Sequence, residues 1–325
     1  MTKRKYKYPF VAFIMLYLSF SAVTLAQTNF NNPISSVEEV DIEKALSSTQ
    51  HFSSLNDRII SLSGYFLGRP YFLGPAGEGE NGDLDQKPLS TWELFDCVTY
   101  VEAVMALAMI NPRSRTNSIN LEMYYENIKQ IKYHSDEISF LTRNHFTELD
   151  WIPYLNRVGI LKDITKSVYF FAPTQYKVID KHQWFMQKTL KDLYLPQMSD
   201  EEKIEALNNF KDRVVDLNLQ PQKVGLKYIP FKMLKLSRIQ SKLPKISIFS
   251  LIRDNHPTNP NIPVMVSHQG LLIRKANGEL YIRHASTSGT KTVMDIALND
   301  YIKMRFKDAP WTSLGLNLQV MRQTD

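Results

Sequence analysis

The organisation of this chain is clearest around one stretch, Phe95-Asp96-Cys97-Val98-Thr99-Tyr100-Val101-Glu102. Apolar residues then recur with the period of a helix, so we expect a helix that begins at Cys97 and ends before Asn111-Pro112. Asp96 stands just before this helix and suits the N-cap, where a carboxylate accepts main-chain N–H groups. We interpret Glu102 as part of the solvated surface of the same helix, and a residue that binds a cationic or amide group of a substrate is the alternative.

Cys97 is the single cysteine among 325 residues, so it has no partner for an internal disulfide. A helix N-terminus offers unpaired N–H groups and a partial positive charge, and both favour a thiolate. Since the chain also has seven histidines, Cys97 is a candidate nucleophile. The alternative is a buried structural thiol, because free cysteine is among the most buried residue types. Position alone leaves both interpretations open.

The first residues are typical of an export signal. A basic segment from Lys3 to Lys7 precedes an uncharged apolar run, Phe10–Leu25, and small residues lead to a cut after Ala26. We predict a signal peptide over residues 1–26 and an exported protein, with the periplasm as its expected location. The apolar run is short for a membrane span, so we expect no stable span after removal of the signal. An uncleaved N-terminal anchor is the alternative.

The charge balance argues against one class of partner. Loss of residues 1–26 would remove four basic and no acidic residues and would lower the formal net charge from +6 to +2. The basic character is therefore largely a property of the signal, and we predict no nucleic-acid partner. With one cysteine, an exported protein has no disulfide framework and depends on its hydrophobic core.

The order of the predicted elements, helices first and an antiparallel sheet last, indicates an α+β fold. Helices are expected near residues 35–46 and 54–62, followed by a loop rich in glycine and proline over 64–82. Residues 115–220 are predicted to be mostly helical. From residue 246 onward, short apolar and β-branched runs predict strands at 263–267, 270–275, 280–285 and 290–294.

Two histidines lie on predicted strands that a hairpin joins. Asn277-Gly278 is a strong turn signal between the strand that begins near His268 and the strand that carries His284. Paired strands can place two imidazoles side by side. A thiol needs a base, and the base needs a group that orients it, so Cys97, His268 and His284 are candidates for these three parts. The alternative is a pair of structural histidines that satisfy main-chain groups.

Zinc binding is the other chemistry that these residue types raise. One cysteine and two histidines without the spacing of metal ligands are weak evidence for it. We therefore predict no metal site.

Four segments follow one another in the order of the motifs of a known family. They are Gly68-Arg69-Pro70-Tyr71-Phe72-Leu73-Gly74-Pro75, Phe95-Asp96-Cys97, Ser267-His268-Gln269-Gly270 and His284-Ala285-Ser286. Together they resemble the Pro-Tyr-x-x-Gly, Asp-Cys-Ser-Gly, His-x-Gly and His-Ala-Ser motifs of the NlpC/P60 cysteine peptidases, which are papain-like cell-wall hydrolases. The chain departs from this pattern at Val98-Thr99, where the family has Ser-Gly. In addition, about 170 residues separate Cys97 from His268.

Both departures fit one branch of that family. Asp96–Glu102, together with Arg143–Phe146 and Asp150-Trp151, resembles the DUF1460 group, also described as AmiA-like amidases. The resemblance implies a papain-like core in which the cysteine, at a helix N-terminus, packs on an antiparallel β-sheet. It also implies three regions: N-terminal helices and the nucleophile helix over 27–112, a large mainly helical insertion over 113–245, and the sheet with the catalytic histidines over 246–325.

The same resemblance implies catalytic roles. Cys97 would be the nucleophile, His268 the general base and acid, and His284 the residue that orients His268. Tyr71 would stand beside the thiol, where its hydroxyl and the Cys97 N–H would hold an oxyanion. This agrees with the general need for donors that already point to where negative charge develops. A loop tyrosine packed on the core is the alternative for Tyr71.

The resemblance further implies a substrate-binding wall formed by Arg143, Asn144 and His145. Arg143 would suit a carboxylate of the substrate, because its planar fork can pair with two oxygens. No metal or organic cofactor is implied.

The implied activity is that of an exported cysteine amidase. It would hydrolyse the N-acetylmuramoyl-L-alanine amide bond of peptidoglycan fragments by thiolate attack and an acyl-enzyme. Two alternatives stay open: an endopeptidase of the NlpC/P60 type that cuts between D-Glu and the diamino acid, and a non-catalytic cell-wall-binding module. A binding module needs no thiol, so the presence of Cys97, His268 and His284 together favours an enzyme.

Overall fold

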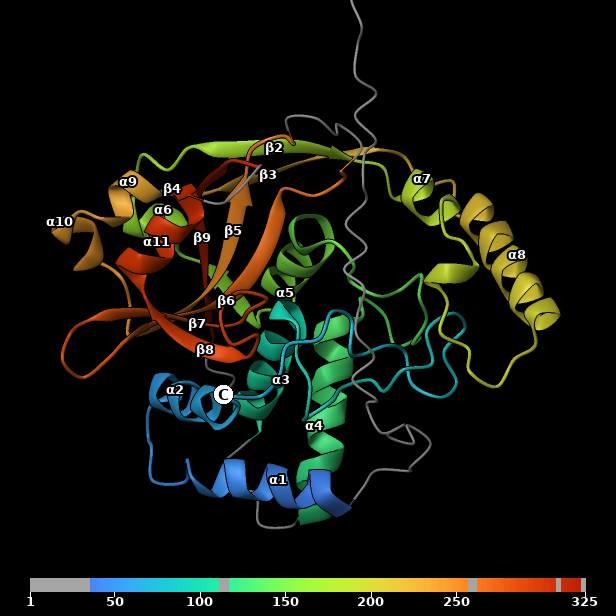
Figure 1. Cartoon of the computed structure of the whole chain (residues 1–325), viewed down its shortest axis with the longest axis horizontal. Coiled ribbons are helices and arrows are strands. Elements are labelled where there is room, and N and C mark those ends of the chain that lie inside the picture. The colour runs from blue at the N-terminus through green and yellow to red at the C-terminus, as the bar shows by residue number, and fades with distance from the viewer. Residues whose placement is uncertain (1–35, 111–116, 257–261, 308–310, 323–325) are drawn as a thin grey trace, which may run out of the picture. The chain divides into compact units, whose positions relative to one another are not determined.

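The computed structural model describes residues 36–110, 117–256, 262–307 and 311–322. Within these residues the chain is α+β, with eleven α-helices, a seven-stranded antiparallel sheet and a separate two-stranded ribbon (Figure 1). The predicted α+β class is therefore confirmed. The predicted signal peptide, residues 1–26, lies outside the described residues.

The α-helices are α1 (Ser36–Ser47), α2 (Leu55–Tyr65), α3 (Cys97–Met109), α4 (Asn117–Lys132), α5 (Ile152–Arg157), α6 (Thr165–Val168), α7 (Lys181–Met186), α8 (Asp200–Asp216), α9 (Phe231–Leu234), α10 (Ser237–Gln240) and α11 (Leu298–Lys307). A π-helical turn, η1 (Thr147–Trp151), precedes α5, and a 3₁₀ turn, η2 (Leu190–Asp192), follows α7. The strands are β1 (Leu161–Asp163), β2 (Thr174–Ile179), β3 (Gln222–Lys227), β4 (Ile229–Pro230), β5 (Ile246–Arg253), β6 (Val266–Arg274), β7 (Leu280–Ala285), β8 (Val293–Ala297) and β9 (Ser313–Met321).

The main sheet has the strand order β1-β9-β5-β6-β7-β8, and β4 also pairs with β9. Every pairing is antiparallel. Strand β5 is buried along nearly its whole length, so its sequence lacks the apolar–polar alternation of a strand with one wet face. Its side chains instead enter two cores in turn: Ile246 and Ile248 enter one, and Phe249 and Leu251 enter the other.

Helices cover both faces of this sheet. The larger core joins the sheet to residues of α1 to α5, and the smaller core joins the opposite face to residues of α6, α9, α10 and α11. Helix α3 lies inside the larger core, and every residue from Thr99 to Ala108 is buried. A helix that is buried on all sides is apolar all round, which explains its alanine-, valine- and methionine-rich sequence. This packing brings the start of α3 against β6.

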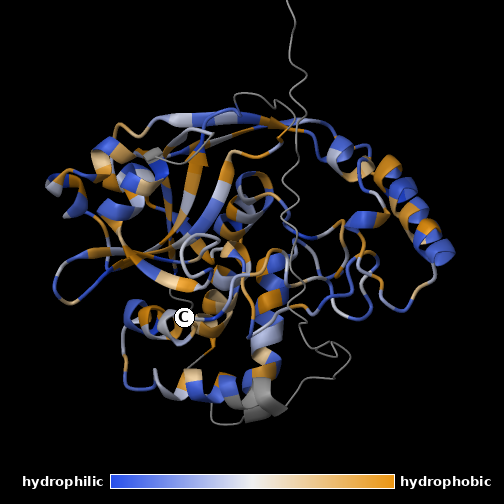
Figure 2. Cartoon of the chain, in the orientation of Figure 1, coloured by the Kyte–Doolittle hydropathy of each residue, from blue (hydrophilic) through white to orange (hydrophobic). Residues whose placement is uncertain are grey.

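The region between α4 and β4 has a small core of its own. Helices α7 and α8 pack on each other away from the main sheet (Figure 1). On α8, Leu207, Phe210 and Val214 form one buried face at helical spacing. The other buried members of the cluster are Leu84, Phe140, Leu141 and Phe185. Figure 2 shows hydrophobic residues alternating with hydrophilic ones along α8, as expected for a helix with one buried face.

The structure corrects several predicted elements. Segments 263–267 and 270–275 belong largely to one continuous strand, β6, and the region predicted as mostly helical also contains β1 and β2. Strand β9 and helix α11 were missing from the prediction. In β9 the buried Asn317 and Gln319 interrupt the apolar pattern, and both amides donate to Asp163 at 2.7 and 3.0 Å. No local pattern predicts this partner, because Asp163 lies on the distant strand β1.

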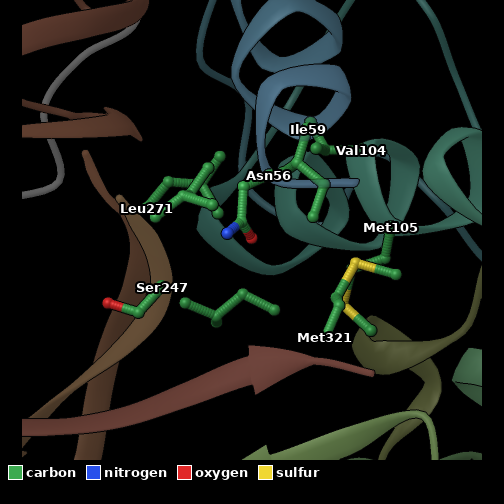
Figure 3. A pocket seen from close by; sticks show the side chains of 9 residues that line it. Asn56, Ile59, Val104, Met105, Ser247, Leu271 and Met321 are labelled. Carbon is green, nitrogen blue, oxygen red and sulfur yellow. The ribbon is translucent and has the colours of Figure 1, made fainter. Parts of the chain in front are cut away.

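A small cavity remains between α2 and α3 on one side and β5, β6 and β9 on the other. Its volume is about 10 Å³, which is room for at most one water molecule. Figure 3 shows Asn56, Met105 and Met321 among the side chains around this space. The cavity is a packing defect of the larger core, and Cys97 does not line it.

The buried Arg283 connects the sheet to α2. Its guanidinium donates two hydrogen bonds to Asp295 on β8, at 2.7 and 3.0 Å. A third nitrogen donates to the Ile60 carbonyl at 3.1 Å and to the Ser63 hydroxyl at 2.9 Å. We expect Arg283→Met to lower the free energy of unfolding by about 3 kcal/mol, because it leaves the half-buried Asp295 with Lys275 as its charged partner and removes the donor to Ile60 and Ser63. Urea unfolding measures this change.

The matched control is Lys303→Met, which removes an ion pair between two exposed side chains, Lys303 and Asp300. An exposed pair contributes about 0 to 1 kcal/mol, so this variant should unfold close to the wild type. Equal losses in the two variants would contradict the role given to Arg283.

Candidate active site

Asp96 positions Cys97 as the first residue of α3. Its Oδ1 accepts the main-chain N–H groups of Val98 and Thr99 at 3.0 and 2.8 Å, and the Asp96 N–H donates to the Thr99 hydroxyl at 3.0 Å. This reciprocal capping box confirms the predicted N-cap. It also gives a structural reason for Thr99, where the resembled family has glycine.

The second oxygen of Asp96 holds the segment that carries Tyr71. Asp96 Oδ2 accepts the Gly74 N–H at 3.1 Å, and Gly74 has a φ of +64°, a conformation that glycine adopts without strain. The Tyr71 N–H donates to the Lys291 carbonyl at 2.7 Å, and Phe72 and Phe95 are joined by a main-chain hydrogen bond of 3.0 Å. The segment therefore runs between the start of α3 and the loop before β8.

The two predicted histidines are hydrogen-bonded to each other. His268 Nε2 and His284 Nδ1 are 2.6 Å apart, and the ring planes are nearly perpendicular. His268 is half-buried on β6, and His284 is 1% exposed on β7. A Cβ on Gly270 would lie 2.7 Å from the Arg283 carbonyl oxygen and 2.9 Å from the His284 Cβ. Glycine at this position therefore allows β7 to bring His284 beside His268.

A cavity of about 170 Å³ is lined by both the Cys97 thiol and His268. It lies between the start of α3, the start of β6 and the turn η1. The residues that line it are Cys97, Val98, His145, Thr147, Glu148, Val264, Val266, Ser267, His268 and Gln269. The structure thus brings Cys97 and His268 together across about 170 residues of sequence.

The thiol is neutral in this setting. Burial raises the pKa of Cys97 to about 12, and the Asp96 carboxylate adds to the shift. Hydrogen bonding by the main-chain groups of Gln269, Cys97 and Val98 acts in the opposite direction but is weaker. The helix N-terminus was expected to favour the thiolate, and burial outweighs that effect here.

Tyr71 lies close enough to Cys97 and Asp96 for both to affect the pKa of its hydroxyl. Burial raises the pKa of the Tyr71 hydroxyl to about 12, and Cys97 and Asp96 are the next causes. The hydroxyl therefore keeps its proton and is a hydrogen-bond donor near the thiol.

Both imidazoles are neutral at neutral pH. Burial, and next the neighbouring His284, hold the pKa of His268 well below its usual value. Burial also lowers the pKa of His284 to about 3, and Arg305 acts in the same direction. A neutral imidazole can accept the proton of the thiol, so His268 is in the state that a general base needs.

The three residues predicted to bind substrate lie in different surroundings. Within the described part of the chain, His145 lines the cavity, whereas Arg143 and Asn144 do not. Arg143 donates to Glu78 at 3.0 Å and to the Ala76 carbonyl at 3.2 Å. Asn144 donates its main-chain N–H to the Lys132 carbonyl at 2.7 Å. Both residues thus hold the segment that presents His145.

The interpretation of Glu102 as a solvated residue was wrong. Glu102 is 5% exposed, and burial raises its carboxyl pKa to about 7, against the opposing effect of Lys132 and Arg143. The buried side chains of Glu78, Asp85, Glu102 and Lys132, with the half-buried Arg143, form what we call the buried charged cluster. The sequence pattern predicts that this face of α3 is exposed to solvent. In the structure, α4 and the loop before α3 cover it.

Sequence reasoning missed the contribution of η1. Thr147 and Glu148 line the cavity, and Glu148 Oε1 accepts the main-chain N–H groups of Met265 and Val266 at 2.5 and 3.3 Å. A π-helical turn is uncommon and occurs frequently at functional sites, but its sequence carries no distinctive signal. The only local indication was that Glu148, a carboxylate, follows closely after the predicted wall residues Arg143, Asn144 and His145.

In the described part of the chain, no three or more His, Cys, Asp or Glu side chains are grouped so that they could hold a metal ion. None of the helices there has the length and apolar character needed to cross a membrane.

A thiol at a helix N-terminus and a histidine pair on the adjacent sheet are the groups that a thiol-based hydrolase requires. The chain belongs to the AmiA-like family, described as N-acetylmuramoyl-L-alanine amidase-like, whose family model matches residues 61–307. The predicted resemblance to this DUF1460 branch is therefore confirmed.

Solved structures support the same family assignment. A DUF1460 protein from Legionella pneumophila is 32% identical, with a TM-score of 0.77 over 88% of this chain and 94% of the other. An N-acetylmuramoyl-L-alanine amidase from Bacteroides uniformis is 21% identical, with a TM-score of 0.56 over 83% of this chain and 99% of the other, and shares the fold. The chain matches no curated protein.

The raised pKa of Cys97 predicts how its thiol reacts. Alkylation by iodoacetamide requires the thiolate, so the rate should rise about tenfold per pH unit from pH 6 to 9 and should not level off there. Mass spectrometry of the intact protein measures the rate, and the single cysteine makes the labelled site unambiguous. A free thiol of ordinary pKa, which levels off near pH 9, is the control. A rate that is constant from pH 6 upward would indicate a thiolate–imidazolium pair instead.

Proposed function

We propose that this protein is a cysteine amidase that hydrolyses the N-acetylmuramoyl-L-alanine bond of peptidoglycan fragments. The observation that carries the proposal is the cavity in which Cys97 and His268 meet, with His284 hydrogen-bonded behind His268. The family description and the name of the Bacteroides uniformis structure support the choice of bond.

The proposed reaction begins with a neutral thiol and a neutral imidazole. His268 Nε2 is engaged by His284, so Nδ1 is the nitrogen available to Cys97. For Nδ1 to accept a proton, Nε2 must carry its own proton and donate it to His284 Nδ1. His284 thereby selects the tautomer of His268 and stabilises the imidazolium that forms, as the third member of a catalytic triad does.

Proton transfer and attack then occur together. The Cys97 sulfur bonds to the lactyl carbonyl carbon of the muramic acid while its proton moves to His268. The carbonyl oxygen becomes an oxyanion, which the Tyr71 hydroxyl and the Cys97 N–H stabilise. His268 returns the proton to the alanine nitrogen, the C–N bond breaks, and the stem peptide leaves with a free amino group. Water, deprotonated by His268, hydrolyses the thioester and regenerates the thiol.

The finer assignments form part of the same proposal. The core is of the papain-like NlpC/P60 type, and His145 forms the part of the wall that meets substrate, with Arg143 and Asn144 holding it in place. The protein acts outside the cytoplasm, in the periplasm, because the predicted signal over 1–26 would export it and its substrate is a cell-wall fragment.

Mass spectrometry of soluble muropeptides tests the function. The purified protein should release an intact stem peptide that begins with L-alanine, and Cys97→Ala and His268→Ala should each lower the rate by at least 10³-fold. His51→Ala removes an exposed histidine and should leave the rate unchanged. Release of an L-Ala-D-Glu dipeptide instead would assign the endopeptidase activity, and equal cleavage by Cys97→Ala would exclude the thiol mechanism. Binding without cleavage would favour the wall-binding module.

A further inference from the structure

Glu148 has a feature that the proposed reaction does not use. It lines the cavity together with Cys97 and His268, and it is only 2% exposed. Its Oε1 accepts two main-chain hydrogen bonds, from Met265 and Val266. Its Oε2 is buried and has no hydrogen-bond partner among the described residues. Buried polar atoms are rarely left unpaired, so this oxygen points to a missing ligand.

The two oxygens of Glu148 have different roles because of their surroundings. Burial raises the pKa of this carboxyl to about 7, so below that pH the group is mostly neutral. Since two N–H groups already point at Oε1, the proton of the neutral carboxyl belongs on Oε2. Oε2 is then a hydrogen-bond donor, and its natural partner is an acceptor such as an amide carbonyl oxygen.

We propose that Glu148 is a substrate-recognition residue, whose Oε2 donates a hydrogen bond to a carbonyl oxygen of the amide-rich ligand in this cavity. The inference rests on the proposed function for the identity of that ligand. It adds a polar contact at the part of the cavity lining that η1 provides. The muramoyl-peptide class fits, because its acetamido, lactyl and peptide carbonyls are all neutral acceptors.

The other groups in the cavity do not titrate in the range where Glu148 does. Burial holds the pKa values of His145 and His268 well below their usual value. Burial also raises the pKa of Cys97 to about 12. A change in ligand binding between pH 6 and 8 would therefore come from Glu148 or from a group outside the cavity.

Charged groups on the neighbouring elements have other partners. On η1, Asp150 is paired with Lys181 of α7 at 3.1 Å. On β3, Lys223 lies over the Tyr176 ring and Lys227 donates to the Thr174 hydroxyl. On α5, Arg157 lies over the Tyr154 ring. Glu102 in the buried charged cluster also has a pKa raised to about 7, which makes it the necessary control.

Ligand binding to an inactive protein tests the proposal separately from catalysis. The probe is N-acetylmuramoyl-L-alanyl-D-isoglutamine, and its Kd for Cys97→Ala is measured by calorimetry from pH 6 to pH 8. If only the protonated carboxyl binds, the Kd should weaken about tenfold across this range. Adding Glu148→Gln should keep the Kd at pH 6 within about twofold and abolish the pH dependence. The glutamine oxygen can accept the two N–H groups while its NH₂ donates as Oε2–H did.

The matched control is Cys97→Ala with Glu102→Gln, which should retain the tenfold change with pH. A Kd that does not depend on pH in Cys97→Ala, a pH dependence that survives Glu148→Gln, or no binding of the probe would each overturn the proposal. pH-dependent binding without hydrolysis by the wild type would retain the role of Glu148 and reject the amidase. Hydrolysis by the wild type together with pH-independent binding would retain the amidase and reject the role of Glu148.

Discussion

The carboxylate of Asp96 is the point on which the candidate site depends. One oxygen satisfies the first free N–H groups of α3, and the other accepts the N–H of Gly74. Hydrogen bonds to a charged acceptor are about twice as strong as those between neutral groups, and these join a helix start to a separate loop. The same carboxylate therefore places the thiol of Cys97 and the segment of Tyr71 together. It also makes the thiol harder to ionise, so the site needs a base.

The base comes from the sheet, and its position depends on main-chain packing as much as on hydrogen bonding. Gly270 lets β7 approach β6 closely, and Arg283 ties β7 to α2 and β8. His284 thus reaches His268 from a strand that is anchored on both sides. Because both rings are neutral, their hydrogen bond can select a tautomer without a carboxylate. The proposed third member of the triad is therefore an imidazole whose rigidity comes from the sheet.

The region between α4 and β4 completes the site from the other side. The buried charged cluster costs desolvation energy, and its ion pairs offset that cost only while every partner is present. This requirement fixes the loop before α3 against the segment that presents His145. Just beyond it, the turn η1 brings Glu148 to the cavity and fastens it to the start of β6. One wall of the cavity is thus built from a part of the chain that contributes neither Cys97 nor the histidine pair.

Local features of the sequence predicted those parts of the structure that depend on interactions between residues close together in the chain. The N-cap at Asp96, the helix from Cys97, the strand of His284, the α+β class and the family resemblance all follow from short-range patterns, and the structure and the comparisons agree with them. Tertiary structure alone decided the burial of Glu102, the continuity of β6, the existence of β9 and the arrival of Glu148 at the cavity. In each of these cases the deciding partner lies far away in the sequence, such as Lys132 for Glu102 or Asp163 for Asn317. Burial and the pairing of polar groups depend on such distant contacts, whereas capping and periodicity depend on neighbours within one or two turns of the chain.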